Sequence, residues 1–219
     1  MMRDAVKVEI FGDVLCPWCY IGLHRVELAL GMVAEPVRDR LEPVWRCHAL
    51  IPDAPKTPGP TVPEAMAGYL PAEQVPARIA LIESTGSEHG LVIDLAGTRQ
   101  VSSFDAHRLL ALAADRGCAA ELWRLLFRAH FSEHRVISST TVLAELGVEA
   151  GLAEDEVTRL LTGTERAEQV RADYRRSAES GVTAIPSIVL DGGRPISGLA
   201  PAAEVAELLG TAVSNANRS

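Results

Sequence analysis

Alternating apolar and polar positions open the chain and predict a strand. Within residues 6–15, VKVEIFGDVL, the first half places an apolar side chain at every second position, which is the period of a half-buried strand. From about residue 20 to 37 the apolar positions recur at helical spacing. Residues 42–51, EPVWRCHALI, then predict a second strand. The chain therefore begins with a predicted βαβ unit.

The middle of the chain has a different pattern. A proline-rich stretch over residues 52–63 marks a boundary, and from there to about residue 178 the apolar spacing predicts helices and no strand. Ser102, followed three residues later by Asp105, predicts a capping box at the start of one of these helices. The predicted helices cover residues 71–89, 102–117, 119–133, 138–151, 153–164 and 164–181.

Strands return at the carboxyl end. Residues 185–198 predict a hairpin around the turn DGG, and residues 201–213 predict an amphipathic helix. The order βαβ, helices, ββα is that of an α/β thioredoxin fold interrupted by a helical insertion. The predicted parts are residues 1–56 for the amino-terminal half of that fold, 57–178 for the insertion and 179–219 for its carboxyl-terminal half.

Composition narrows the function classes. Of the 219 residues, 47% are hydrophobic, which is enough for a sizeable core. The formal net charge of −8 argues against a nucleic-acid partner. No apolar run approaches the roughly 18–20 residues of a membrane helix, so no membrane partner is expected. The first residues lack the apolar core of a signal peptide, and a cytoplasmic location is therefore expected.

The chemistry of the sequence lies in Cys16 and Cys19, two residues apart at the predicted start of a helix. A thiol attacks a disulfide as the thiolate, which the unpaired N–H groups of a helix N-terminus stabilise. Cys19, one turn later, could resolve a mixed disulfide formed at Cys16. The pattern therefore predicts a dithiol that exchanges disulfides, and four cysteines are too few for a disulfide scaffold.

The cysteine pair has two other interpretations. A structural zinc site normally takes four ligands, and Cys47, His48 and Cys118 do not form a second pair with the required spacing, so no metal is expected. The pair could also be inert and buried. Cys118 itself, at a helix junction, is expected to be a small buried residue.

The sequence resembles the DsbA-family thioredoxin-like oxidoreductases, most closely the FrnE-like branch, which is related to the 2-hydroxychromene-2-carboxylate isomerases and the kappa-class glutathione transferases. The resemblance covers nearly the whole chain. It rests on the stretches DVLCPWCYIGLHRVE, VWRCHALIPDAP, SFDAHRLL, LWRLLFRAHF, GVTAIPSIVLDG and SGLAP.

This resemblance implies a thiol–disulfide oxidoreductase that acts on cysteine-containing proteins or peptides. It implies substrate contacts at Pro17 and Trp18 within the CPWC motif and at Ile185 and Pro186, with Pro186 in the cis form beside the dithiol. The alternative for Pro186 is an ordinary trans proline at the start of a strand. The resemblance also implies a redox partner, either glutathione or a thioredoxin-like protein, and no tightly bound cofactor.

Several assignments stay open at this stage. His107 could pack in a helix, lie on the surface or contact substrate, and Cys47 could be a third redox thiol or a packing residue. The branch usually has Pro-Phe in place of Cys47-His48 and Asn in place of Ser102, so substrate specificity does not carry over. The alternative function is a glutathione-dependent isomerase or transferase acting on a small molecule, and a non-enzymatic zinc-binding or interaction module is a third. A homodimer is neither required nor excluded by the sequence.

Overall fold

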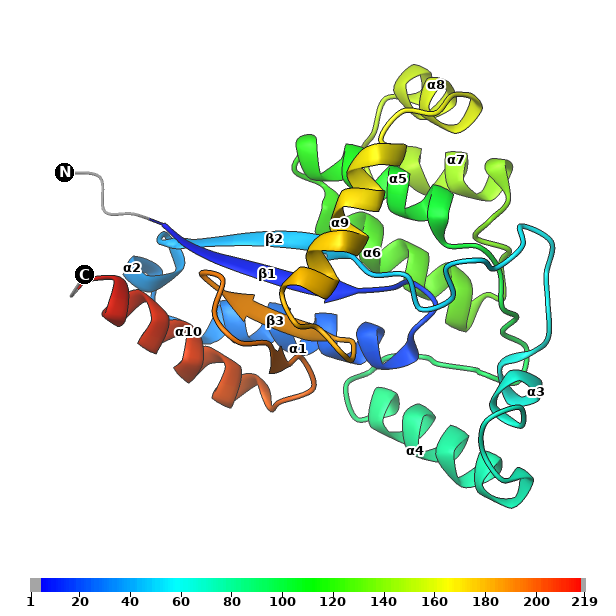
Figure 1. Cartoon of the computed structure of the whole chain (residues 1–219), viewed down its shortest axis with the longest axis horizontal. Coiled ribbons are helices and arrows are strands. Elements are labelled where there is room, and N and C mark those ends of the chain that lie inside the picture. Colours follow the sequence, from blue (N-terminus) through cyan, green and yellow to red (C-terminus); the bar gives the residue numbers. More distant parts are fainter. Residues whose placement is uncertain (1–4, 218–219) are drawn as a thin grey trace. The chain divides into compact units, whose positions relative to one another are not determined.

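The computed structural model describes residues 5–217 and divides into two compact units. The first comprises Met1–Asp13, Trp18–His48 and Asp173–Ser219, and the second comprises Val14–Pro17 and Ala49–Ala172. Each unit has its own secondary structure, shown in Figure 1. Within the described residues, no helix is both long enough and apolar enough to cross a membrane.

The first unit contains a mixed sheet, as the pattern of the sequence predicts. Over the described residues its strands have the order β2-β1-β3-β4. β1 pairs in parallel with β2 and antiparallel with β3, and β3 pairs antiparallel with β4. This arrangement confirms the predicted α/β thioredoxin fold. The strands are β1 (Val6–Gly12), β2 (Leu41–Cys47), β3 (Ser187–Leu190) and β4 (Ile196–Ser197).

Helices α1 (Pro17–Met32) and α10 (Ala202–Ala216) pack against one face of this sheet (Figure 1). Alternate residues of β1 project to that face and join one core cluster with Val26 of α1 and Leu209 of α10. Every residue of β1 except Lys7 is buried, because it lies between two other strands and is covered on both faces. A short helix, α2 (Glu35–Arg38), connects α1 to β2.

The other face of the sheet carries a smaller cluster and a set of charges. Phe11 of β1 is fully buried there with Val182 and Val189. Helix α9 (Ala167–Glu179) begins in the second unit and ends in the first. Its carboxyl-terminal half, from Asp173 on, supplies the first unit with side chains that bind β1 and β2.

The second unit is helical. Its described residues 49–172 contain no strand, and their one pairing of this kind is an isolated bridge between Thr61 and Arg99. Its core is formed by fully buried leucines of several helices, including Leu109, Leu122 and Leu143. The elements are α3 (Val62–Met66), the 3₁₀ turn η1 (Ala72–Gln74), α4 (Val75–Ser87), α5 (Phe104–Asp115), α6 (Ala119–Phe127), the π-helical turn η2 (Arg128–Ser132), α7 (Thr140–Glu149) and α8 (Glu154–Thr162).

One local prediction is wrong, and one short helix was not predicted. The capping box at Ser102 and Asp105 does not form, because Ser103 precedes α5 and Asp105 instead pairs with Lys56 and Arg108. A capping box does form at the end of the proline-rich stretch, where the side chains of Thr61 and Glu64 exchange hydrogen bonds with each other's backbone and start α3. No helix was predicted there, because prolines dominate the composition of that segment.

Candidate active site

The CPWC motif lies at the start of α1. Cys16 directly precedes the helix, Pro17 is its first residue and Cys19 its third. Proline suits this position because the N–H that it lacks would have no partner inside the helix. The first turn of α1 holds no acidic residue, so no carboxylate of that turn opposes the positive end of the helix dipole. The two cysteines are only 5% and 3% exposed, and Pro17 is also buried, whereas Trp18 is partly exposed.

Pro186 packs against α1. The Ile185–Pro186 peptide bond is cis, and Pro186 is buried directly before β3. A Cβ atom built on Gly22 of α1 would lie 2.5 Å from Cγ of Pro186, so the proline ring occupies the space that a side chain would need. Gly22 follows Cys19 by three residues, which places both on one face of the helix. The ring of Pro186 therefore rests on the face of α1 that carries Cys19.

The carboxyl end of β2 lies beside the end of β1, and it carries Cys47 and His48. Cys47 stands opposite Gly12 in the parallel register, and the amide of His48 donates to the Gly12 carbonyl at 2.8 Å. The Nδ1 atom of His48 lies 2.8 Å from Oγ of Ser177 on α9. The amide of Cys47 donates to Oδ2 of Asp173, also on α9, at 3.3 Å. These contacts attach α9 to the last residue of β2 and to the residue that follows it.

Two acidic residues set the electrostatics around Cys47. Burial, the negative charge of Asp173 and that of Asp13 raise the pKa of the Cys47 thiol well above its usual value, and the nearby Arg46 only partly opposes them. Asp13 is completely buried. Burial and the same negative groups also raise the pKa of Tyr174. Cys47 is therefore held as a protonated thiol at neutral pH, which does not suit a third nucleophile.

A second charged group holds α9 to the central strand. Glu9 of β1 has a side chain only 1% exposed, and it accepts hydrogen bonds from Arg176 at 2.8 Å and from Arg46 at 3.0 Å. Arg46 also donates to Oδ1 of Asp173 at 3.0 Å. Burial alone would raise the pKa of Glu9, but hydrogen bonds from Arg176 and Arg46 and their positive charges outweigh it and lower the pKa.

Other residues singled out by the sequence lie in the helical unit. His107 is fully buried in α5, with its ring centroid 6.3 Å from that of Trp123, so it does not lie on the surface. Cys118 was expected to be buried but is partly exposed, because it directly precedes α6. Within residues 5–217, no group of three or more His, Cys, Asp or Glu side chains is arranged to hold a metal ion.

The acidic residues of this site carry little signal in the sequence. Glu9 occupies a polar position of an alternating strand, where a solvent-facing side chain is the ordinary expectation. Asp173 lies on a charge-rich helix, where acidic residues ordinarily face solvent, but it is only 7% exposed. The one available signal was at Asp13, a charged residue within the otherwise apolar run that leads into the CPWC motif.

Comparison with known structures supports the fold over nearly the whole chain. A probable DsbA oxidoreductase from Streptomyces coelicolor is 36% identical, with a TM-score of 0.87 over 95% of this chain and 90% of that one. A 2-hydroxychromene-2-carboxylate isomerase has a TM-score of 0.70 at 15% identity, over 97% of this chain and 99% of its own. The cytosolic disulfide reductase DsbM from Pseudomonas aeruginosa with GSH has a TM-score of 0.57 at 20% identity, over 97% of this chain and 100% of its own.

Sequence comparison gives the family. A search of curated proteins found no significant match. The family described as DSBA-like thioredoxin domain matches residues 7–210, which include the CPWC motif, Pro186 and the intervening helices. The chain therefore belongs to the DSBA-like thioredoxin domain family.

Proposed function

We propose that this protein is a thiol–disulfide oxidoreductase that acts on the cysteines of proteins or peptides, with Cys16 as the nucleophile and Cys19 as the resolving thiol. The observation that carries the proposal is the position of the two cysteines on α1. Cys16 directly precedes the helix and Cys19 lies in its first turn, in a chain of the DsbA-like family. A helix N-terminus favours the thiolate form of the residue that precedes it.

The proposed reaction proceeds in two exchanges. The Cys16 thiolate attacks one sulfur of a substrate disulfide, forms a mixed disulfide and releases the other substrate sulfur as a thiolate, which takes up a proton. The Cys19 thiol then loses its proton and attacks Sγ of Cys16. The Cys16–Cys19 disulfide forms and the second substrate thiol leaves, so two electrons have passed from the enzyme to the substrate. Oxidation of a substrate dithiol is the same sequence in reverse.

Substrate is proposed to contact the residues on either side of the dithiol. Pro17 and Trp18 separate the two cysteines, and the partly exposed Trp18 offers an apolar surface to a peptide. Ile185 and Pro186 are the second contact. Support for this assignment comes from the Pro186 ring, which lies on the face of α1 that carries Cys19. An extended peptide held there by backbone hydrogen bonds would gain about 0.5–1.5 kcal/mol per bond.

Turnover requires a partner that returns the dithiol to its starting state. We propose glutathione or a thioredoxin-like protein in this role, in the cytoplasm and without a tightly bound cofactor. The likeness to DsbM, described as a cytosolic disulfide reductase and solved with GSH, supports this choice of partner and compartment.

Two variants test the proposal in insulin reduction and in oxidative refolding of a reduced model protein. Cys16→Ser should lose activity in both assays. Cys19→Ser should still attack once and then stall as a mixed disulfide, which mass spectrometry detects on Cys16. Substrates trapped on Cys19→Ser in a cell extract would identify the physiological partners. Near-normal activity of Cys16→Ser in both assays would overturn the assignment of the nucleophile.

The likeness to the isomerase supports a second candidate function, glutathione-dependent chemistry on a small molecule. The two candidates differ in their need for Cys19, because an isomerase requires no resolving thiol. Glutathione-dependent turnover of a small electrophile by Cys19→Ala, together with tight glutathione binding, would favour the isomerase. Weak glutathione binding and a mixed disulfide on Cys16 under oxidised glutathione would favour the oxidoreductase. Metal analysis of the purified protein tests the zinc-binding alternative.

A further inference from the structure

The helical unit contains a small cavity whose ionisable lining residues are all basic. The cavity has a volume of about 130 Å³ and lies between the loop that follows α4 and the end of the π-helical turn η2. Among the described residues that line it, the ionisable side chains are two arginines and two histidines, and the others are glycine and valine. The lining residues are Gly97, Arg99, Val101, His130, His134, Arg135 and Val136.

The ring of His134 is held in a defined position at this cavity. A Cβ atom on Gly97 would lie 2.5 Å from the ring, so only glycine at this position leaves room for it. Nε2 of His134 lies 3.1 Å from the Asp94 carbonyl oxygen and 3.2 Å from Oδ2 of Asp94. The backbone of His134 has a φ of 51°, in the left-handed region that side chains other than glycine adopt infrequently. Local geometry therefore fixes the imidazole at the cavity wall.

The loop that supplies Gly97 and Arg99 is tied to η2. The amide of Asp94 donates to the Phe131 carbonyl at 2.8 Å, and the hydroxyl of Thr98 donates to the Asp94 carbonyl at 2.7 Å. His130 is 3% exposed, and its ring meets that of Phe131 edge-on with centroids 4.7 Å apart. Hydrogen bonds therefore hold the backbone of the loop that carries Arg99 against the backbone of η2, which carries His130.

The arginines are oriented by groups that do not line the cavity. Arg99 donates from Nη1 to the Gly59 carbonyl at 3.0 Å. Arg135 pairs with Glu145, and its Nη1 lies 3.9 Å from Glu133. These carboxylates, like that of Asp94, offset part of the positive charge but are absent from the described lining. The residues that line the cavity thus include four basic side chains and no acidic one, and the nearest printed carboxylate is that of Asp94 beside His134.

We propose that this cavity binds a phosphate group. Its volume of about 130 Å³ is well above the roughly 10–15 Å³ that a single water needs and below the roughly 300–1,000 Å³ of a site for a drug-sized ligand, so it suits a small ion. Arginine binds phosphate through paired N–H donors. Phosphate carries more charge and more acceptor oxygens than a carboxylate, so a lining with two arginines, two histidines and no acidic residue favours it. The site makes no use of the dithiol and is separate from the proposed redox function.

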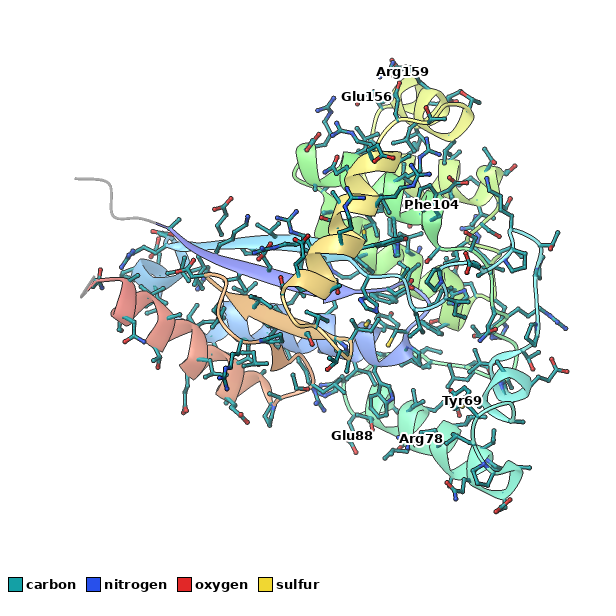
Figure 2. All side chains as sticks on the ribbon, viewed as in Figure 1. Tyr69, Arg78, Glu88, Phe104, Glu156 and Arg159 are labelled. Atoms are coloured by element: carbon teal, nitrogen blue, oxygen red, sulfur yellow. The ribbon has the colours of Figure 1, made fainter. Side chains whose placement is uncertain are left out.

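The test is a titration of the intact protein with inorganic phosphate in about 0.15 M chloride, an ionic strength that screens surface charge. Calorimetry gives the affinity, and amide chemical shifts give the location. We expect saturable shifts at Gly97, Arg99 and Arg135. The double variant Arg99→Gln/Arg135→Gln should bind at least about tenfold more weakly, as loss of charge-assisted hydrogen bonds implies. Arg78→Gln is the matched control, since Arg78 is an exposed arginine of α4 in the same unit (Figure 2).

The outcomes separate the alternatives. Sulfate is expected to compete and acetate not to, and equal binding of methyl phosphate would show that the phosphate group of a larger molecule also fits. No saturable shift in the wild-type protein, shifts that map elsewhere, or preference for acetate would overturn the proposal. An equal loss of affinity in Arg78→Gln would also overturn it, because it would indicate a general effect of charge. The wild-type shifts decide the matter even if the double variant does not fold.

Discussion

The ring of Pro186 fills the space that a side chain at Gly22 would occupy. An added Cβ would lie 2.5 Å from Cγ of Pro186 and 3.0 Å from the carbonyl oxygen of Gly198. Pro186 is buried and Gly198 is backbone-bound to it, since the Gly198 amide donates to the Pro186 carbonyl at 3.0 Å. Neither neighbour can move away easily. Gly22 therefore sets how closely α1 approaches the residues that precede β3.

We expect Gly22→Ala to destabilise the protein, because an extra methyl group in a packed site costs about 1–3 kcal/mol. Gly31→Ala is the matched control in the same helix, as nothing lies within 4 Å of its added Cβ. That change should instead stabilise by roughly 0.5–1 kcal/mol, since alanine is the better helix former. Urea unfolding measures both. Insulin reduction should slow only in Gly22→Ala, and equal stabilities of the two variants would contradict the packing described here.

The charges around Glu9 give a prediction for pH. The pKa of Glu9 is lowered in the folded protein, so its contribution to stability is complete above the unfolded-state pKa of about 4.3 and is lost as the pH falls through the folded-state value. We expect Glu9→Gln to cost about 1–3 kcal/mol at pH 7, as hydrogen bonds to charged groups do. The difference from wild type should shrink in acid.

Urea unfolding of Glu9→Gln at pH 7 and at about pH 3 tests this sign, since a carboxylate of normal pKa would already be largely protonated there. Glu42→Gln is the control, because Glu42 is exposed on the neighbouring strand. A difference between Glu9→Gln and wild type that grows in acid would show that the carboxylate is not stabilised by its two arginines.

The sequence predicted those parts of the molecule that follow from local pattern. The alternation of apolar and polar residues predicted the central strand. The CPWC motif predicted that the two cysteines lie at the start of a helix. Both signals lie within a few consecutive residues. The short helix α3 was missed because its Thr61–Glu64 capping box stands among prolines, which indicate a loop when composition is considered alone.

The surroundings of the dithiol helix could not be predicted in this way. The amide of Cys47 and the carboxylate of Asp173 are 126 residues apart, and Glu9 and Arg176 are 167 residues apart. No local period links such positions. Helix α9 is rich in charge on every turn, so its pattern did not distinguish the residues that meet β1 and β2 from those that face solvent.

Arg108 should stabilise the helical unit through the geometry of its guanidinium. It is 4% exposed, donates from Nε to the Glu165 carbonyl at 2.8 Å and from Nη2 to the Gly163 carbonyl at 2.8 Å, and pairs with Asp105. Gly163 directly follows α8, and Arg108 also donates to the carbonyl of Leu160 within it, so two of these bonds serve carbonyls at the end of that helix. One planar fork reaches all of these acceptors.

We therefore expect Arg108→Lys to destabilise by about 2–4 kcal/mol although it keeps the charge, because several carbonyls lose the donors of a buried guanidinium. Arg159→Lys on the exposed side of α8 (Figure 2) is the control and should change stability by less than about 0.5 kcal/mol. Hydrogen exchange should accelerate over residues 160–167 in Arg108→Lys. Equal stabilities of the two lysine variants would mean that the fork geometry contributes nothing.

The thiol of Cys47, at the end of β2, is expected to react slowly and to take no part in disulfide exchange. Burial and the charges of Asp173 and Asp13 raise its pKa, so its thiol stays protonated at neutral pH and reacts slowly with electrophiles. Iodoacetamide at pH 7.5, followed by mass spectrometry, should label Cys16 of the reduced protein first. Cys118, which is partly exposed, should react faster than Cys47.

In denaturant the four cysteines should react alike, and Cys47→Ala should retain insulin reduction. Rapid labelling of native Cys47, or a folded Cys47→Ala without activity, would instead make Cys47 a third redox thiol.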